Sequence, residues 1–255
     1  MSGRLASLYR HPVKGFTPER LPRATLGPGA HFPCDRMYAV ENGPSGFDPA
    51  KPAHLHKSKF TVLAQIPDVA RARTSFDETR GIFNVEAEGH GSLAADLTRR
   101  EGREALAAWL TGVLGEAVRG PLRVMSAPPH RFMDDVKGCV SLINLESVRD
   151  FAARAGRPID PLRFRANLYV EGLPAWSEFD IIGGQVSVGG VRAEVIKAIV
   201  RCAATHVDPA TAERDFELVP ALHEHYGHVL CGVYLNVLNG GEVVEGDAVT
   251  FGDPT

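Results

Sequence analysis

The chain has 255 residues, is 44% hydrophobic and 23% charged, and carries a formal net charge of −3. This length and composition are typical of a globular protein with one large domain or two smaller ones. The small negative charge argues against a nucleic-acid binder or a protein attracted to anionic membranes. No apolar run reaches the ~18 residues of a membrane span. Four widely spaced cysteines and a first segment without an apolar signal-peptide core predict a soluble, cytoplasmic protein.

Glycine and proline divide the first half into short segments, which favours β structure with turns. Residues 41–52 combine Gly, Pro, Ser and Asp, and this composition predicts a surface loop. The expected strands of this half are residues 5–9, 24–26, 36–41, 59–66 and 81–88.

One helix is expected after these strands. Thr98 and Glu101 have the spacing of a capping box. The apolar side chains from Leu106 to Leu114 then recur at intervals of three and four residues, and Gly115 is a suitable end. We place a domain boundary just after this helix, which gives domains of residues 1–118 and 119–255.

The second half combines further short strands with one helix. Asn144 is a suitable N-cap for a helix that extends to residue 155 and is ended by Gly156. Gly189 and Gly190 form a tight hairpin turn, for which we expect a positive φ at both positions. The expected strands are residues 140–143, 167–171, 185–188, 191–200, 229–238 and 248–251. Strands outnumber helices, so the second half is predicted to be a closed or nearly closed β structure.

Four basic residues lie where expected strands meet turns: Lys14, Arg36, Arg165 and Arg201. Loops on a rigid scaffold often carry function. If these junctions converge, the four cations would hold a doubly charged anion such as a phosphate, with arginine binding it through two nitrogens. The alternative for each residue alone is a solvated surface charge.

Cys202 follows Arg201 at the end of an apolar strand and precedes a turn. An adjacent guanidinium favours the thiolate, which is both the nucleophile and the metal-ligand form of cysteine. The alternative is a small buried core residue, as many free cysteines are.

Two other groups of residues are weaker candidates for a metal site or a catalytic site. His223, His225, His228 and Cys231 have zinc-ligand side chains, but their spacing fits no standard zinc signature, so surface or hydrogen-bonded histidines are the favoured interpretation. The adjacent Asp134 and Asp135 are either an acid/base pair or, as we favour, an exposed turn.

Several segments together resemble one family. The second half resembles the MOSC domain, the C-terminal module of molybdenum cofactor sulfurases. The first half resembles the β-barrel domain that precedes it in proteins similar to the mitochondrial amidoxime reducing component. The matching segments are residues 9–15 (YRHPVKG), 35–38 (DRMY), 140–144 (VSLIN), 163–167 (RFRAN), 170–172 (VEG), 201–202 (RC), 205–211 (THVDPAT), 232–234 (GVY) and 244–247 (VEGD). They occur in the family order and cover nearly the whole chain.

The resemblance implies a mostly β (α+β) fold, in which an N-terminal β-barrel-like domain packs on a MOSC β-barrel with a few helices. It also implies binding of the molybdenum cofactor in its Mo-molybdopterin form. Cys202 would be the protein ligand to molybdenum, and Asp208 a residue that shapes or protonates the site. Pyridoxal phosphate binding is a further property associated with the domain. The residues expected to hold pterin and phosphate are Lys14, Gly15, Arg36, Gly138, Cys139, Ser141, Arg165, Asn167, Val200 and Arg201.

The sequence departs from the family pattern at four positions, and these departures bear on the activity more than on the cofactor. Gly15 replaces a polar residue, Ala166 replaces a proline, and Ala212 replaces a glycine. Ala198 lies in the region where reducing relatives often have a second cysteine.

We expect a reductase that removes oxygen from N-hydroxylated, N–O or S–O small molecules. The chain has no ferredoxin-type cysteine cluster, so electrons would come from an external ferredoxin- or cytochrome b5-type donor with its reductase. The alternatives are a sulfur carrier or transferase with a persulfide on Cys202, and a non-catalytic cofactor-binding protein. The loops expected to select the substrate are residues 41–57 and 128–138.

Overall fold

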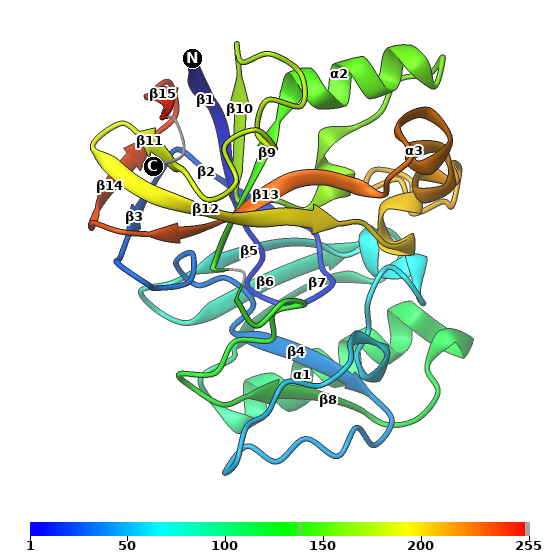
Figure 1. Cartoon of the computed structure of the whole chain (residues 1–255). Helices are drawn as coiled ribbons and strands as arrows, with labels where there is room; N and C mark the ends of the chain where they lie inside the picture. The colour runs from blue at the N-terminus through cyan, green and yellow to red at the C-terminus, as the bar shows by residue number, and fades with distance from the viewer. Residues whose placement is uncertain (138, 253–255) are drawn as a thin grey trace.

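The computed structural model describes residues 1–137 and 139–252 of the chain. A closed β-barrel forms one part of the molecule, and a group of smaller sheets with one long helix forms the other (Figure 1). The predicted mostly β fold is therefore confirmed. No helix of the described part of the chain is both long and apolar enough to cross a membrane.

Seven strands form the barrel, in the order β10-β9-β13-β12-β11-β15-β1, and pairing between β1 and β10 closes it. Neighbouring strands are antiparallel except for β9 and β10. The barrel strands are β1 (Ser2–Arg10), β9 (Val140–Asn144), β10 (Leu168–Glu171), β11 (Gln185–Val188), β12 (Val191–Val200), β13 (Leu230–Val237) and β15 (Ala248–Phe251). Strand β2 (Glu19–Leu21) extends the sheet by pairing with β1, whereas β3 (Arg23–Leu26) pairs with β14 (Gly241–Val244) in a separate two-stranded sheet.

The barrel interior is a packed apolar core. Along the first half of β12, Val191, Ala193 and Val195 are buried, whereas Arg192 and Glu194 are exposed. This two-residue alternation places every second side chain inside the barrel. The inward side chains of the other strands join the same cluster, so apolar side chains fill the barrel interior.

The first strand of the chain belongs to this barrel. Leu5 of β1 pairs with Val170 of β10, and Ser2 pairs with Thr250 of β15. Of the range 1–118 that we assigned to the first domain, β1, β2 and β3 therefore lie with the barrel (Figure 1).

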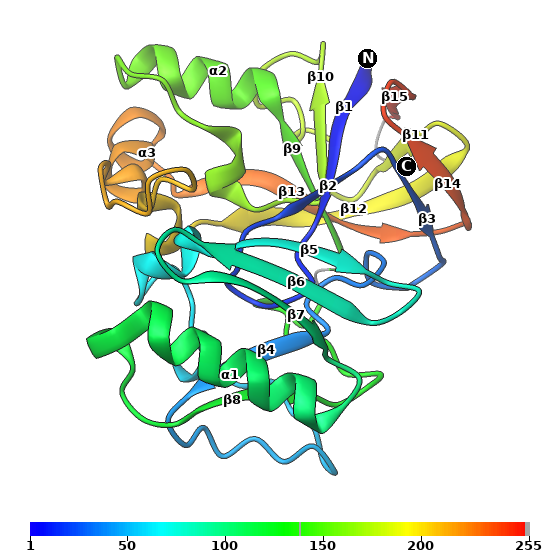
Figure 2. The ribbon, with the colours of Figure 1, turned by 180° about the vertical axis from the view of Figure 1, so that it is seen from behind.

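The second part of the molecule has its own core. Helix α1 (Arg100–Leu114) contacts β7 and β8, and Figure 2 shows it beside these strands at the foot of the molecule. Its buried face, with Leu106 and Leu110, packs into the apolar cluster of this part. The strands are β4 (Tyr38–Asn42) paired with β8 (Leu122–Ser126), and the sheet β5 (Arg73–Asp77), β6 (Ile82–Ala87) and β7 (Gly91–Asp96).

Helix ends were predicted with mixed success. Gly115 ends α1 with a φ of 49°, as expected. The predicted capping box is wrong, because the Thr98 hydroxyl donates to Asp96 and the helix begins without a side-chain cap. The N-cap of α2 (Leu145–Arg154) is confirmed, since the Asn144 side chain accepts the Glu146 amide at 3.1 Å. Helix α3 (Leu218–Tyr226) was not predicted.

Two local predictions are wrong. Residues 59–66 form no strand. They follow the 3-10 helix η1 (Lys57–Lys59), and only a bridge between Glu41 and Phe60 links them to a neighbouring strand. The apolar side chains there are inserted individually into two cores, which overrides the extended pattern. In the hairpin before β12, Gly189 alone has a positive φ, of 54°.

Candidate functional site

A cavity of about 110 Å³ lies where β12 ends, and Cys202 lies in its wall. Five cationic side chains from several segments also line it: Arg36, Lys57, Arg163, Arg165 and Arg201. Three of these are among the four basic residues that we expected to converge. We call this space the Cys202 cavity.

Cys202 leads from β12 into the 3-10 helix η5 (Ala203–His206). Its side chain is partly exposed, and the Thr205 hydroxyl donates to its carbonyl oxygen at 2.9 Å. Lys57 lies close to the thiol. Burial lowers the Lys57 pKa, but the neighbouring Cys202, Asp134 and Tyr234 raise it above its ordinary value. The ammonium is therefore charged at neutral pH and places a positive charge beside the Cys202 side chain.

Arg165 is a cation without a counter-ion in the described part of the chain. It follows the 3-10 helix η4 (Pro161–Phe164) and has a φ of 53°, so the chain turns sharply there. No described residue accepts a hydrogen bond or forms an ion pair with its guanidinium. Burial and the charge of Arg36 lower its pKa to about 10. A bound anion would relieve both effects, so the geometry is that of an anion site.

Arg36 lies beside Arg165 and is held in place from two sides. It forms an ion pair with Asp35, and its Nη2 donates to the Arg165 carbonyl oxygen at 3.2 Å. Burial lowers the Arg36 pKa, but Asp35 and Asp134 raise it above its usual value. Arg36 therefore stays charged, with two guanidinium nitrogens already engaged, one by Asp35 and one by the Arg165 carbonyl oxygen.

Lys14 is buried next to the cavity rather than in its lining. Its Nζ donates to the Phe132 carbonyl oxygen at 2.8 Å and to Asp134 Oδ1 at 2.5 Å. Burial raises the Asp134 pKa, but the charge and hydrogen bond of Lys14 lower it to about 2. The Asp134 side chain is 54% exposed, as expected for a turn, but the ion pair makes it the partner that holds Lys14.

Arg201 lines the cavity, but its guanidinium donates hydrogen bonds to backbone carbonyl oxygens. Its Nε donates to the Cys231 carbonyl oxygen and its Nη1 to the Phe164 carbonyl oxygen, each at 2.8 Å. The side chain therefore ties the end of β12 to β13 and to the turn before Arg165. Val200, by contrast, is 68% exposed and lies at the cavity wall.

Ser141 and Asn167 form a closed pair at the start of β9 and β10. Asn167 Oδ1 accepts from the Ser141 amide at 3.1 Å and from its hydroxyl at 2.9 Å, and Asn167 Nδ2 donates to the Tyr9 carbonyl oxygen. Ser141 lines the cavity and Asn167 does not. The pair therefore connects β9, β10 and β1 beside the cavity, and these hydrogen-bonding atoms are engaged with each other or with Tyr9.

The remaining expected site residues lie away from the cavity or outside the described residues. Gly15 has a φ of 91° and packs against the Thr61 backbone, where an added Cβ would lie 2.3 Å from the carbonyl oxygen. The Cys139 thiol lies 3.9 Å from the Gly29 carbonyl oxygen and does not line the cavity. Gly138 is outside the described residues.

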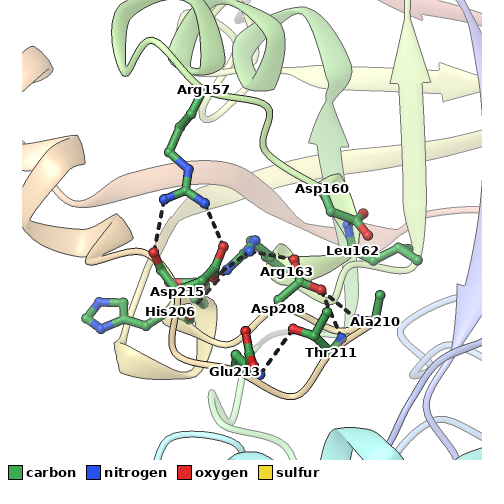
Figure 3. A network of polar contacts seen from close by, with 11 residues as sticks. Arg157, Asp160, Leu162, Arg163, His206, Asp208, Ala210, Thr211, Glu213 and Asp215 are labelled. Carbon is green, nitrogen blue, oxygen red and sulfur yellow. Dashed lines mark hydrogen bonds and ion pairs between the residues drawn. The ribbon is translucent and has the colours of Figure 1, made fainter.

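Asp208 belongs to a polar network around Arg163 and does not line the cavity (Figure 3). Arg163 is 3% exposed and pairs with Asp208 at 2.8 Å and with Asp215 at 2.7 Å. It also donates to the carbonyl oxygens of Thr205 and His206. Arg163 thus fixes the segment that follows Cys202 at four points.

The possible zinc site does not form. His223 and His225 lie on α3, and Cys231 is buried in the cluster under α2 and α3. In the described ranges, no group of three or more His, Cys, Asp or Glu side chains could hold a metal ion. Burial raises the Cys231 pKa to about 12, so this thiol is a neutral core residue.

Lys57, Tyr234 and Arg163 were not predicted as site residues. Lys57 lies in the loop expected to select the substrate, and this position was the only sequence feature that pointed to a role at the site. Arg163 lies two residues before Arg165 in the same motif. His11, also in a quoted motif, is fully buried, and neither ring nitrogen has a hydrogen-bond partner among the described residues.

Residues 2–117 match the MOSC N-terminal beta barrel domain, and residues 129–250 match the MOSC domain. The chain belongs to the MOSC domain family. Two curated relatives are molybdenum cofactor sulfurases, from Caenorhabditis briggsae (31% identical over 150 residues) and Caenorhabditis elegans (29% over 150 residues). Each match covers 56% of this chain but only 21% of the relative, so the MOSC protein corresponds to about a fifth of the sulfurases.

Solved structures of similar proteins are more distant. The YUAD protein from Bacillus subtilis is 12% identical, with a TM-score of 0.43, and the match covers 98% of this chain and 94% of that one. YiiM from Geobacillus stearothermophilus is 18% identical, with a TM-score of 0.36, over 46% of this chain and 55% of that one.

Proposed function

We propose that this MOSC protein binds the molybdenum cofactor at the Cys202 cavity and uses it to reduce N-hydroxylated or other N–O and S–O small molecules. The observation that carries the proposal is the pairing of a partly exposed thiol with an unpaired, half-buried guanidinium, that of Arg165. A soft thiolate suits a sulfur-rich metal centre, and an unpaired cation suits a phosphate. The relation to molybdenum cofactor sulfurases supports the same cofactor.

The side chains present fit the cofactor in donor chemistry. Cys202 offers the metal ligand, while Arg165, Arg36 and Lys57 offer the positive charge that an anionic cofactor needs. The cavity of about 110 Å³ is smaller than the pockets of about 300–1,000 Å³ that enclose whole ligands. It would therefore hold one anionic part of the cofactor, with the remainder over its mouth.

When bound, the cofactor supplies the redox chemistry of oxygen removal. The chain's own residues bind and orient. Arg165 and Arg36 hold the anionic group, and the Lys57 ammonium carries a proton beside the Cys202 thiol. Asp208 acts indirectly, as an acceptor that fixes Arg163 and with it the turn after Cys202. Electrons come from an external donor of the ferredoxin or cytochrome b5 type with its reductase.

Molybdenum and pterin content of protein made in a cofactor-competent host tests this proposal. We expect about one molybdenum per chain in the wild type, loss of the metal in Cys202→Ala, and loss of pterin in Arg165→Gln. Cys139→Ala is the matched cysteine control and should keep both. Wild-type protein with neither molybdenum nor pterin would refute cofactor binding.

A second candidate is a sulfur carrier with a persulfide on Cys202. The sulfurase relatives and the nearby Lys57 ammonium favour it, because a persulfide ionises readily beside a cation. It predicts a labile sulfur on the Cys202 peptide by mass spectrometry and little bound metal. A bound cofactor without reductase activity or labile sulfur would instead indicate a cofactor-binding protein that does no chemistry.

A further inference from the structure

A second pocket, of about 420 Å³, adjoins the Cys202 cavity. Met133 lines both spaces. The pocket is formed by the two loops that we expected to select the substrate, together with His31. Its polar walls are His31, His54, His130 and Arg131, and we call it the histidine pocket.

The histidine pocket carries positive charge without a carboxylate in its lining. Arg131 forms no ion pair and no hydrogen bond with any residue that the structure describes. The acidic side chains that interact with these histidines are already paired: Asp35 with Arg36, and Asp135 with Lys197 at 2.5 Å. An anion entering the pocket would therefore meet an uncompensated guanidinium.

The His31 imidazole responds to this charge. Burial and the charge of Arg131 lower the His31 pKa, while Asp35 raises it and Arg36 and His130 lower it further. Burial and the charge of His54 lower the His130 pKa. His31 Nδ1 is buried without a hydrogen-bond partner among the described residues. The imidazoles do not form a metal site, since no three metal-binding side chains converge within the described ranges.

The pocket also has apolar walls suited to a flat organic group. Met133 is buried, Val136 is 69% exposed, and Pro52 and Pro129 stiffen the two loops. Ligand pockets typically combine such walls with a few polar groups that fix orientation, and they measure about 300–1,000 Å³. The histidine pocket has both features, whereas the Cys202 cavity, at about 110 Å³, is too small for an organic substrate.

We infer that the histidine pocket binds small organic anions, with a carboxylate on Arg131 and the adjoining imidazoles and the carbon skeleton against Met133. The link from this pocket to substrate choice rests on the proposed function, because only then would a molecule held there lie next to the reacting centre. The binding itself does not depend on the cofactor.

Benzoate is a suitable probe, and benzamide is its uncharged counterpart of the same shape. We expect calorimetric titration at pH 6.5 to show benzoate binding at least about tenfold tighter than benzamide, because a charge-assisted hydrogen bond is worth at least that factor. Arg131→Gln should lower benzoate affinity about tenfold. The matched control is Arg23→Gln, an exposed arginine on β3 paired with Glu242, and it should bind as the wild type.

Three results would overturn the inference: no benzoate binding, equal binding of benzoate and benzamide, or unchanged affinity in Arg131→Gln. Molybdenum and pterin content of the same preparations keeps this test apart from the proposed function. Benzoate binding that depends on Arg131 in a protein without molybdenum would support the pocket while contradicting the reductase.

Discussion

Replacing Arg163 by glutamine should destabilise the turn after Cys202 more than any replacement of a surface arginine. The Arg163 side chain is 3% exposed and contacts Asp208, Asp215 and two carbonyl oxygens (Figure 3). Removing one partner of a buried ion pair costs about 3–5 kcal/mol, because the other charge stays behind unpaired.

For Arg163→Gln, we expect a loss of unfolding free energy at the lower end of this range. Asp215 keeps Arg157, whose Nη2 lies 2.6 Å from its Oδ2, and Asp208 keeps the amides of Ala210 and Thr211. Both carboxylates are also about one quarter exposed. We therefore expect a loss of about 3 kcal/mol, which corresponds to a fall of roughly 6–12 °C in the melting temperature.

Urea unfolding with calorimetry measures this loss, and Arg157→Gln is the matched control. Arg157 contacts the same Asp215 from a position that is 35% exposed, so its loss should cost at most about 1 kcal/mol. The rate at which a disulfide reagent modifies Cys202 should rise in Arg163→Gln and stay constant in Arg157→Gln. Equal stability losses in the two variants, or an unchanged thiol rate in Arg163→Gln, would refute the assigned role of Arg163.

Further predictions concern single side chains. Iodoacetamide should label Cys202 and spare Cys231 in the native protein, because Cys231 is 1% exposed and burial raises its pKa to about 12; peptide mass spectrometry shows which thiol reacts. The Asp134 pKa is lowered from 3.8 to about 2, chiefly by Lys14 against burial, so this carboxylate stabilises the fold above pH 3.8 and the contribution disappears towards pH 2. In Asp134→Asn, the melting temperature should fall less between pH 3.8 and pH 2 than it does in the wild type. If the melting temperature of the variant depended on pH as in the wild type, the pairing of Asp134 with Lys14 would be contradicted. Gly15→Ala should cost more than about 2 kcal/mol in urea unfolding, because of its positive φ and the close carbonyl oxygen.

Much of the barrel follows from local patterns in the sequence. The alternation along β12 and the glycine turn before it predict that strand closely, and Asn144 predicts the start of α2. The failure at residues 59–66 has a tertiary cause. Side chains there enter two different cores, and no local pattern records which core receives each one.

The candidate site, like the fold, could be predicted only in part from local sequence patterns. Lys14, Arg36, Arg165 and Arg201 were grouped because each lies where an expected strand meets a turn, and the structure brings all but Lys14 into the lining of the cavity beside Cys202. The hydrogen-bond partners of these side chains could not be predicted. Arg201, for example, donates to carbonyl oxygens of segments that are distant in the sequence. Lys57 reaches the thiol only through the irregular path of its loop. That these residues hold a cofactor stays a prediction.

The closure of the barrel by β1 has a consequence for synthesis of the protein. Strand β1 is made before the barrel strands that it pairs with, β10 and β15, and β15 follows all the other barrel strands in the sequence. The segment with α1 can fold while β1 still waits for its partners, because most of its apolar cluster comes from residues between Val13 and Val124. The barrel is therefore the slow, late-forming element, and β1 keeps unpaired backbone groups until β10 and β15 have been made. Slowing elongation after residue 126 should lengthen this period and increase chaperone dependence or aggregation.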